Sequence, residues 1–137
     1  MKMKKSIPAL PVRNIGESIK FYSEKLGFEA RHYEDEFAIL VRDEVELHLW
    51  KSGDESWRSK GAALSILPVC SGAESFLAGT ASCRIEVQGI NQLFREYQRQ
   101  GVIYDTNTVV VEQPWGDREF PVLDHHRNLI TFYEVIG

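Results

Sequence analysis

Cysteine is scarce in this chain, with only Cys70 and Cys83 among 137 residues. Two thiols at this separation have no metal-binding spacing, so we interpret both as small buried residues of a reducing compartment. Long apolar runs are also missing. No stretch approaches the roughly 20 residues that span a bilayer, and the basic start MKMKKSIPAL lacks the apolar segment of a signal peptide. The sequence therefore predicts a cytoplasmic protein without membrane contact.

An excess of positive charge is absent too. The 16 basic and 20 acidic residues give a formal net charge of −4, which argues against nucleic acid as a partner and favours a cationic one. Apolar residues make up 43% of the sequence, enough to close the core of one domain without disulfides or metals. We therefore expect a single domain over residues 1–137.

Two copies of one unit account for most of the chain. The segment REFPVL at 118–123 repeats DEFAIL at 35–40. A second set of residues recurs at an offset of 75 positions: Val12, Ile15 and Tyr22, then Val87, Ile90 and Tyr97. A unit that cannot bury its own apolar face does so against a copy. The groove between the copies is therefore where we expect function.

Each copy is predicted to fold as a β-α-β-β-β module. We expect an α+β fold in which the two modules form a curved mixed sheet, with helices outside and a concave groove. Module one covers about residues 6–52, a connection 53–79, and module two 80–137. In the connection, Trp57 with Arg58 is either a lid over the groove or a loop anchor, and one short strand is expected at 63–67.

The helices are predicted from their ends and their spacing. Asn14, followed three residues later by Glu17, is typical of a capping box, and Gly27 fits the left-handed residue that ends a helix. Apolar residues recur at helical spacing between these ends, and again over 90–97 before Gly101.

Strands are expected on both sides of the helices. The first, at 6–12, carries Pro8 and Pro11, which donate nothing to a ladder, so we place it at a sheet edge or in an arm that crosses to the partner of a homodimer. The other predicted strands are 29–33, 37–41, 45–50, 81–87, 109–112, 119–123 and 129–135.

The strand at 45–50 assigns residues to the two faces of the sheet. Side chains alternate along a strand, so an apolar trio faces the helix: Val45, Leu47 and Leu49. A more polar trio then lines the groove: Glu46, His48 and Trp50. In the second copy, Tyr133 takes the groove side, and we interpret the turn at His125 and His126 as solvated.

Three segments of the chain carry a family resemblance. They are VRNIGESIKFYSEKLGF at 12–28, YEDEFAILVRDEVEL at 33–47, and EQPWGDREFPVLD at 112–124 with Asn128 downstream. The first and third are similar to much of the vicinal oxygen chelate superfamily. EDEFAILVRDEVEL together with QPWG resembles the bleomycin resistance proteins within it. Two departures, an extra residue at Asp117 and a longer connection, reshape the groove mouth.

Enzymes of this superfamily hold a divalent metal with His and Glu from equivalent strands of both modules. The resemblance places those positions at about Ile7, Glu46, Thr80 or Ala81, and Thr131. Only Glu46 is a metal ligand by type, with His48 beside it as a weak second candidate. One carboxylate does not supply the three ligands that such a centre needs. We therefore expect no metal, no cofactor and no catalytic residue.

The resemblance instead implies binding of a bleomycin-type antibiotic, a cationic glycopeptide with a flat heteroaromatic tail. Aromatic faces stack such a tail and carboxylates attract the cation. Phe37 and Trp115 are placed as the stacking pair, from different subunits, and Trp50 extends the stack. The other expected ligand contacts are Glu34, Asp35, Glu36, His48 and Gly116. The alternative interpretation of Glu34, Asp35 and Glu36 is that they are surface charges in contact with solvent and have no ligand role.

Two other functions stay open on the sequence. One is a metal-dependent lyase, transferase or dioxygenase of the same superfamily, with Glu46 and His48 as its remaining ligands. The other is a non-enzymatic module of the same fold for a different flat metabolite. Elemental analysis tests the first. Growth protection of a sensitive strain across several DNA-damaging drugs tests the second.

Overall fold

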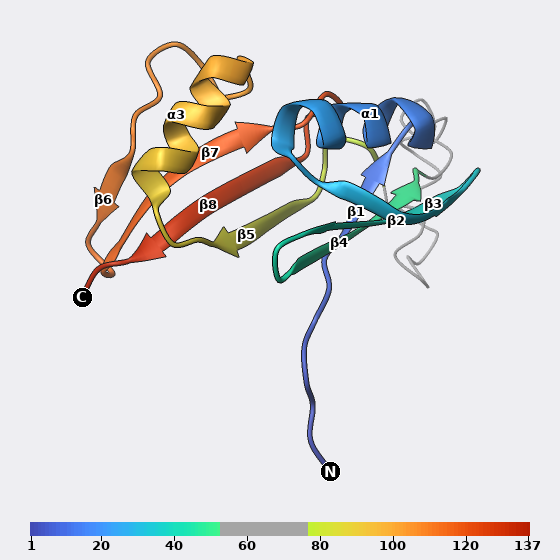
Figure 1. Cartoon of the computed structure of the whole chain (residues 1–137), viewed down its shortest axis with the longest axis horizontal. Coiled ribbons are helices and arrows are strands. Elements are labelled where there is room, and N and C mark those ends of the chain that lie inside the picture. The colour runs from blue at the N-terminus through green and yellow to red at the C-terminus, as the bar shows by residue number, and fades with distance from the viewer. Residues whose placement is uncertain (53–76) are drawn as a thin grey trace, which may run out of the picture.

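The computed structural model describes residues 1–52 and 77–137, so the expectations for Trp57, Arg58, Cys70 and a strand at 63–67 lie outside the described residues. The two modules follow one another along the chain (Figure 1). Module one contains β1 (Ala9–Val12), α1 (Ile15–Leu26), β2 (Glu29–Glu34), β3 (Phe37–Arg42) and β4 (Val45–Lys51). Module two contains β5 (Ser82–Glu86), α3 (Ile90–Gln100), β6 (Val111–Gln113), β7 (Asp117–Leu123) and β8 (Leu129–Val135).

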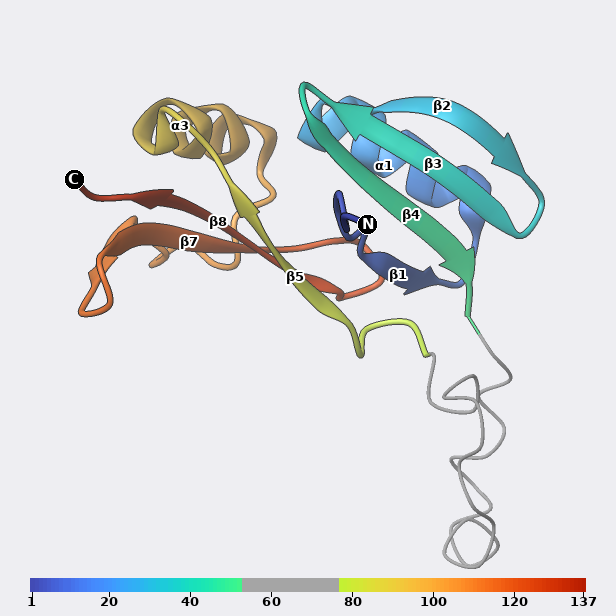
Figure 2. The same ribbon diagram turned by 90° about the horizontal axis from the view of Figure 1, so that it is seen from below.

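Each module forms its own four-stranded mixed sheet. The orders β1-β4-β3-β2 and β5-β8-β7-β6 correspond strand for strand, which confirms the duplication read from the sequence. In each sheet the first strand pairs in parallel with the last, and the remaining pairs are antiparallel. Helices α1 and α3 lie on the same side of the two sheets (Figure 1). Seen from below, the strands of module one lie in front of α1 (Figure 2).

The two helices begin in different ways. Asn14 caps α1 by accepting the Glu17 amide at 2.8 Å, and Gly27 ends this helix with a φ of 79°, as predicted. Helix α3 begins after Gly89, which has no side chain to cap it. Glu134 of β8 replaces the cap, because its carboxylate accepts the Gly89 amide at 2.8 Å and the next amide at 3.3 Å. Neither described helix is long and apolar enough to cross a bilayer.

One apolar core lies between the helices and the sheets. Leu47 and Leu49 are fully buried, whereas Trp50 on the opposite face of β4 is 45% exposed, so the predicted alternation is confirmed. In module two, Ile130 and Phe132 of β8 are buried in the same way. The largest side chains of the core are aromatic: Tyr22, Tyr97, Phe120 and Phe132.

Several polar contacts join the modules, and two of them lie along α1. The Tyr22 hydroxyl donates a buried hydrogen bond of 2.8 Å to the Asp124 carboxylate in the β7–β8 turn. At the end of α1, Arg42 of β3 donates a hydrogen bond to the carbonyl of Leu26. The same guanidinium donates to Glu96 of α3 at 2.9 Å. These contacts fix how module two sits against α1.

Strand β1 is an edge strand, as its prolines predict. Among the described residues it pairs with β4 alone, and the strand is limited to Ala9–Val12. Residues 1–8 run away from the sheets on the side opposite the helices (Figure 1). Residues 1–6 of this segment are exposed, and the Pro8 carbonyl accepts the His48 amide at 3.0 Å.

Candidate ligand-binding site

An aromatic cluster covers the face of the first sheet that points away from α1. Phe37 and Trp50 are direct partners in the β3–β4 ladder, and their ring centroids are 4.4 Å apart. The His48 ring meets Phe37 edge-to-face at 5.1 Å. Since Trp50 stays 45% exposed, its indole offers a flat surface on which a ligand can stack.

Glu46 lies beside this cluster and is surrounded by basic groups. Its carboxylate is 2.7 Å from His48 Nε2, 3.2 Å from Lys5 and 3.3 Å from Arg31. The hydrogen bond with His48, followed by that from Lys5, lowers the pKa of Glu46. Both carboxylate oxygens are engaged, so Glu46 holds His48 in place next to Phe37.

The acidic residues expected to attract a cation lie in and next to the β2–β3 turn. Glu34 ends β2 and pairs with His32 at 3.1 Å. Asp35 and Glu36 form the turn and lead directly into Phe37. All three acidic residues are exposed, so negative charge stands at the edge of the aromatic cluster.

Trp115 lies in the turn between β6 and β7 and is 64% exposed. Its Nε1 donates to Asp117 at 2.9 Å. Gly116 between them has a φ of 98°, a left-handed conformation that a larger residue would strain. The turn therefore presents the indole to solvent while tying its polar edge to the sheet.

Sequence reasoning missed Arg84, which organises the outer face of module two. It forms ion pairs of 2.8 Å with Asp117 and with Glu119, and its guanidinium lies 4.6 Å from the ring centroid of Tyr133. The hydrogen bond to Glu119 is the main cause that raises the pKa of Arg84. Strand alternation was the available signal, because it sets Arg84 opposite the buried Ile85.

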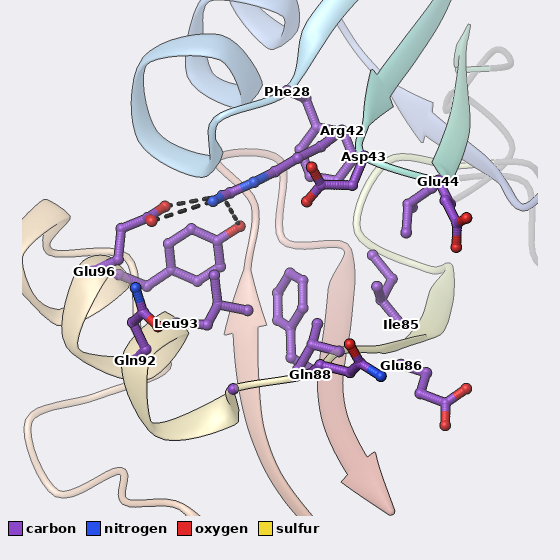
Figure 3. A pocket seen from close by; sticks show the side chains of 15 residues that line it. Phe28, Arg42, Asp43, Glu44, Ile85, Glu86, Gln88, Gln92, Leu93 and Glu96 are labelled. Atoms are coloured by element: carbon purple, nitrogen blue, oxygen red, sulfur yellow. Dashed lines mark hydrogen bonds and ion pairs between the residues drawn. The ribbon is translucent and has the colours of Figure 1, made fainter.

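The expected ligand contacts fall into two groups on different modules. Phe37, His48 and Trp50 lie on the first sheet, and Trp115 lies in the β6–β7 turn of module two. No ring contact joins the two groups in the described ranges. A cavity of about 640 Å³ does lie between the modules of the chain. Arg42 and Glu96 stand on its wall (Figure 3), and none of the expected ligand contacts lines it.

The positions that the superfamily resemblance implies for a metal do not fit one. Ile7, Ala81 and Thr131 carry no carboxylate, imidazole or thiol. Glu46 is the exception, and it is engaged with His48 and two basic residues. A divalent ion at this place needs at least three protein ligands, so we assign no chemistry to a metal there.

The prediction of a solvated turn after β7 is wrong for one of its two histidines. His125 is exposed, but His126 is only 7% exposed, and its Nδ1 accepts the Arg13 amide at 3.1 Å. Ser18 of α1 is fully buried beside it. Because serine is small, the turn packs closely against α1, a contact that no local pattern in the sequence reveals.

The duplicated β-α-β-β-β topology and its open, aromatic sheet faces define a class of paired-module α+β proteins. Residues 7–132 match the Glyoxalase/Bleomycin resistance protein/Dioxygenase superfamily. The chain is also 51% identical, over 134 residues, to proteins named bleomycin resistance protein from Geobacillus stearothermophilus and Staphylococcus aureus, with 98% of each chain covered. The chain therefore belongs to this superfamily, which confirms the resemblance read from its motifs.

Solved structures agree with this assignment. The fold is similar to a bleomycin-binding protein from Streptomyces verticillus complexed with copper(II)-bleomycin, with a TM-score of 0.72, 26% identity, and 100% of this chain and 98% of that chain covered. It is also similar to a bleomycin resistance determinant encoded on the transposon Tn5, with a TM-score of 0.70, 18% identity, and 97% and 98% covered.

Proposed function

We propose that this protein binds bleomycin-type antibiotics and sequesters them without chemical modification, in the cytoplasm and before they reach DNA. One observation carries the proposal: the Phe37–Trp50 pair, 4.4 Å between centroids, keeps an exposed indole beside the acidic β2–β3 turn. Stacking surface next to negative charge suits a flat, cationic ligand. Relatives at 51% identity, named bleomycin resistance proteins, support the same assignment.

The binding cleft is built from two copies of the chain. Phe37 and Trp115 lie on different modules, and no ring contact joins them in the part of the chain that the structure describes. A ligand that stacks on both is held by module one of one chain and module two of another. Light scattering should give a mass near twice 15.7 kDa. A monomer at micromolar concentration would remove the two-chain cleft.

The test is a titration with copper-bleomycin, followed by tryptophan fluorescence and by calorimetry. We expect quenching at micromolar ligand. Trp115→Ala should weaken binding about tenfold, since one stacked base or ring contributes roughly 1–3 kcal/mol. Tyr104→Ala is the control, because Tyr104 is an exposed aromatic residue of module two, 51% accessible, with no expected ligand role. Equal affinity in Trp115→Ala and the control would contradict the proposal.

Mass spectrometry of the drug after incubation separates sequestration from catalysis. Unmodified bleomycin, recovered in stoichiometric amount, is expected. A modified product would favour the alternative of a metal-dependent enzyme. Growth protection by flat compounds other than bleomycins, without bleomycin binding, would favour a module for another metabolite.

A further inference from the structure

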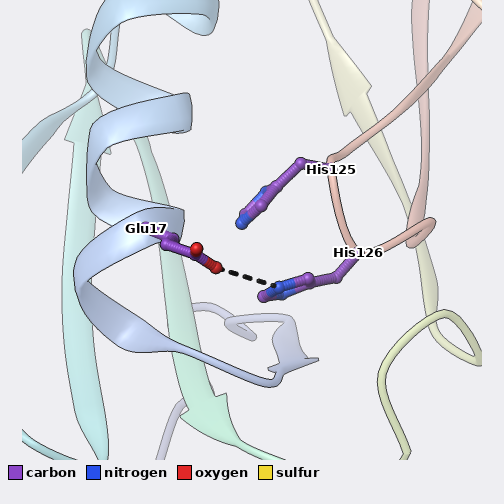
Figure 4. A group of neighbouring side chains, drawn as sticks. All are labelled: Glu17, His125 and His126. Atoms are coloured by element: carbon purple, nitrogen blue, oxygen red, sulfur yellow. Dashed lines mark ion pairs between the residues drawn. The ribbon is translucent and has the colours of Figure 1, made fainter.

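The β7–β8 turn of module two brings two adjacent histidines against the first turn of α1. Glu17, His125 and His126 each offer one ligand atom, and these atoms all lie within 4.8 Å of one another. The three side chains point toward one another across the junction of the modules (Figure 4). Glu17 Oε2 lies 3.9 Å from His126 Nε2. This place is distinct from the aromatic faces described above.

The surrounding structure holds both imidazole rings in position. The Asp124 carboxylate accepts the His126 amide at 2.9 Å and fixes the turn. The His125 ring stacks on Phe21 of α1, with centroids 5.1 Å apart, and its Nε2 lies 3.4 Å from Ser18 Oγ. The centroids of the His125 and His126 rings are only 3.9 Å apart. Both imidazole side chains are therefore held beside Glu17 before any ligand arrives, which lowers the entropy lost on binding, but the proton on His126 must still change nitrogen.

The three side chains supply a mixed donor set. His126 is buried and His125 is exposed, and an imidazole binds a metal through a nitrogen that carries no proton. Glu17 is exposed and adds a carboxylate. Two imidazoles and one carboxylate form the donor set that suits zinc and its neighbours in the first transition row.

We propose that Glu17, His125 and His126 form a binding site for a divalent cation of the zinc class, which fastens α1 of module one to the β7–β8 turn of module two. Three protein ligands leave a fourth tetrahedral position open for water. The ion bridges segments more than a hundred residues apart in the sequence, so it acts as a cross-link between the modules. Neither the stacking residues nor the acidic β2–β3 turn takes part.

Metal binding changes the hydrogen bonds of His126 in a defined way. Its Nδ1 accepts the Arg13 amide at 3.1 Å, so in the neutral ring Nε2 carries the proton. Coordination through Nε2 moves that proton to Nδ1. Ser18 Oγ, 3.5 Å away, then becomes the acceptor, because its own proton is donated to the Asn14 carbonyl at 2.7 Å. The Arg13 amide then no longer donates to Nδ1, and this change in its environment gives the site a spectroscopic signature.

The first measurement is calorimetric titration of EDTA-treated protein with zinc chloride near neutral pH. Micromolar binding of one ion per chain is expected. Glu17→Gln and His125→Asn change exposed side chains that do not form the core, and each should weaken binding by at least about tenfold. Glu24→Gln on the same helix and His32→Asn on β2 are the matched controls and should bind zinc like the wild type. Circular dichroism checks that every variant is folded.

The second measurement follows backbone amides by nuclear magnetic resonance during the same titration. The Arg13 amide should shift in the wild type and stay unchanged in His125→Asn at equal zinc concentration. The proposal fails if the wild type binds no zinc. It also fails if binding survives Glu17→Gln and His125→Asn but is lost in His48→Asn, which would place the ion at the Glu46–His48 pair. These experiments use zinc and no antibiotic. A negative result would therefore refute the metal site without testing the proposed binding of bleomycin.

Discussion

Trp115 donates its indole N–H to the Asp117 carboxylate at 2.9 Å, and the same carboxylate oxygen accepts Arg84 at 2.8 Å. Asp117 is 5% exposed, and its other oxygen is buried without a hydrogen-bond partner among the described residues. A buried carboxylate is costly unless it is paired. Asp117 is therefore a positioning residue for the exposed indole.

Asp117→Ala should weaken copper-bleomycin binding about tenfold, because the indole loses a hydrogen bond to a charged group worth about 1.5 kcal/mol. Tryptophan fluorescence anisotropy should fall at the same time, since the freed indole moves more. Glu112→Ala, an exposed residue of β6, is the control. Unchanged anisotropy in Asp117→Ala would show that the turn alone orients Trp115.

The sequence predicted the elements well because each carries its own periodic signal. Strand alternation placed Leu49 inside and Trp50 outside, and both placements are confirmed. Strand ends were less accurate: β7 begins at Asp117 rather than at residue 119. The side-chain contact between Arg84 and Asp117 was missed, because residues 33 positions apart meet there only after the sheet has formed.

Helix ends show the same division between local and distant signals. The cap of α1 is readable in the sequence, since Asn14 and the residue it caps are three positions apart. The cap of α3 is not readable, because Glu134 reaches Gly89 from β8, 45 positions later. Burial of His126 also depends on a distant segment, the first turns of α1. Long-range pairs of this kind supply part of both candidate sites.

Tyr22→Phe tests the buried contact between the modules. The change removes the hydroxyl that donates to Asp124 at 2.8 Å and leaves a buried carboxylate with one partner fewer. Burial and the Asp124 charge both raise the pKa of Tyr22, so the neutral hydroxyl persists across the accessible pH range. We expect a loss of about 1–3 kcal/mol in the free energy of unfolding, measured with urea. Tyr33→Phe, at an exposed tyrosine, should have almost no effect.

Cys83 should be nearly inert toward iodoacetamide in the folded protein. Burial, and secondarily the Asp124 charge, raise the pKa of its thiol to about 11. The reactive thiolate is then scarce at mildly basic pH, so alkylation should be about a hundredfold slower than in urea. Peptide mass spectrometry measures the alkylation of Cys83 separately from that of Cys70. Equal rates in native buffer and urea would mean that the thiol is not sheltered.

Glu134→Gln tests the borrowed cap of α3 through its pH dependence. Hydrogen bonds from the amides of Gly89 and Ile90 lower the pKa of Glu134 below its ordinary value of 4.5. A carboxylate with a depressed folded pKa contributes stability that is fully present above the unfolded pKa and is lost as pH falls through the folded one. The difference in urea midpoint between wild type and Glu134→Gln should therefore be largest at neutral pH and shrink as the pH falls below 4.5. Glu24→Gln controls for the loss of one negative charge. A non-zero difference that stays constant over the same range would show that the ionisation of Glu134 does not contribute to the cap. No difference at neutral pH would show that the amide of glutamine caps α3 as well as the carboxylate does.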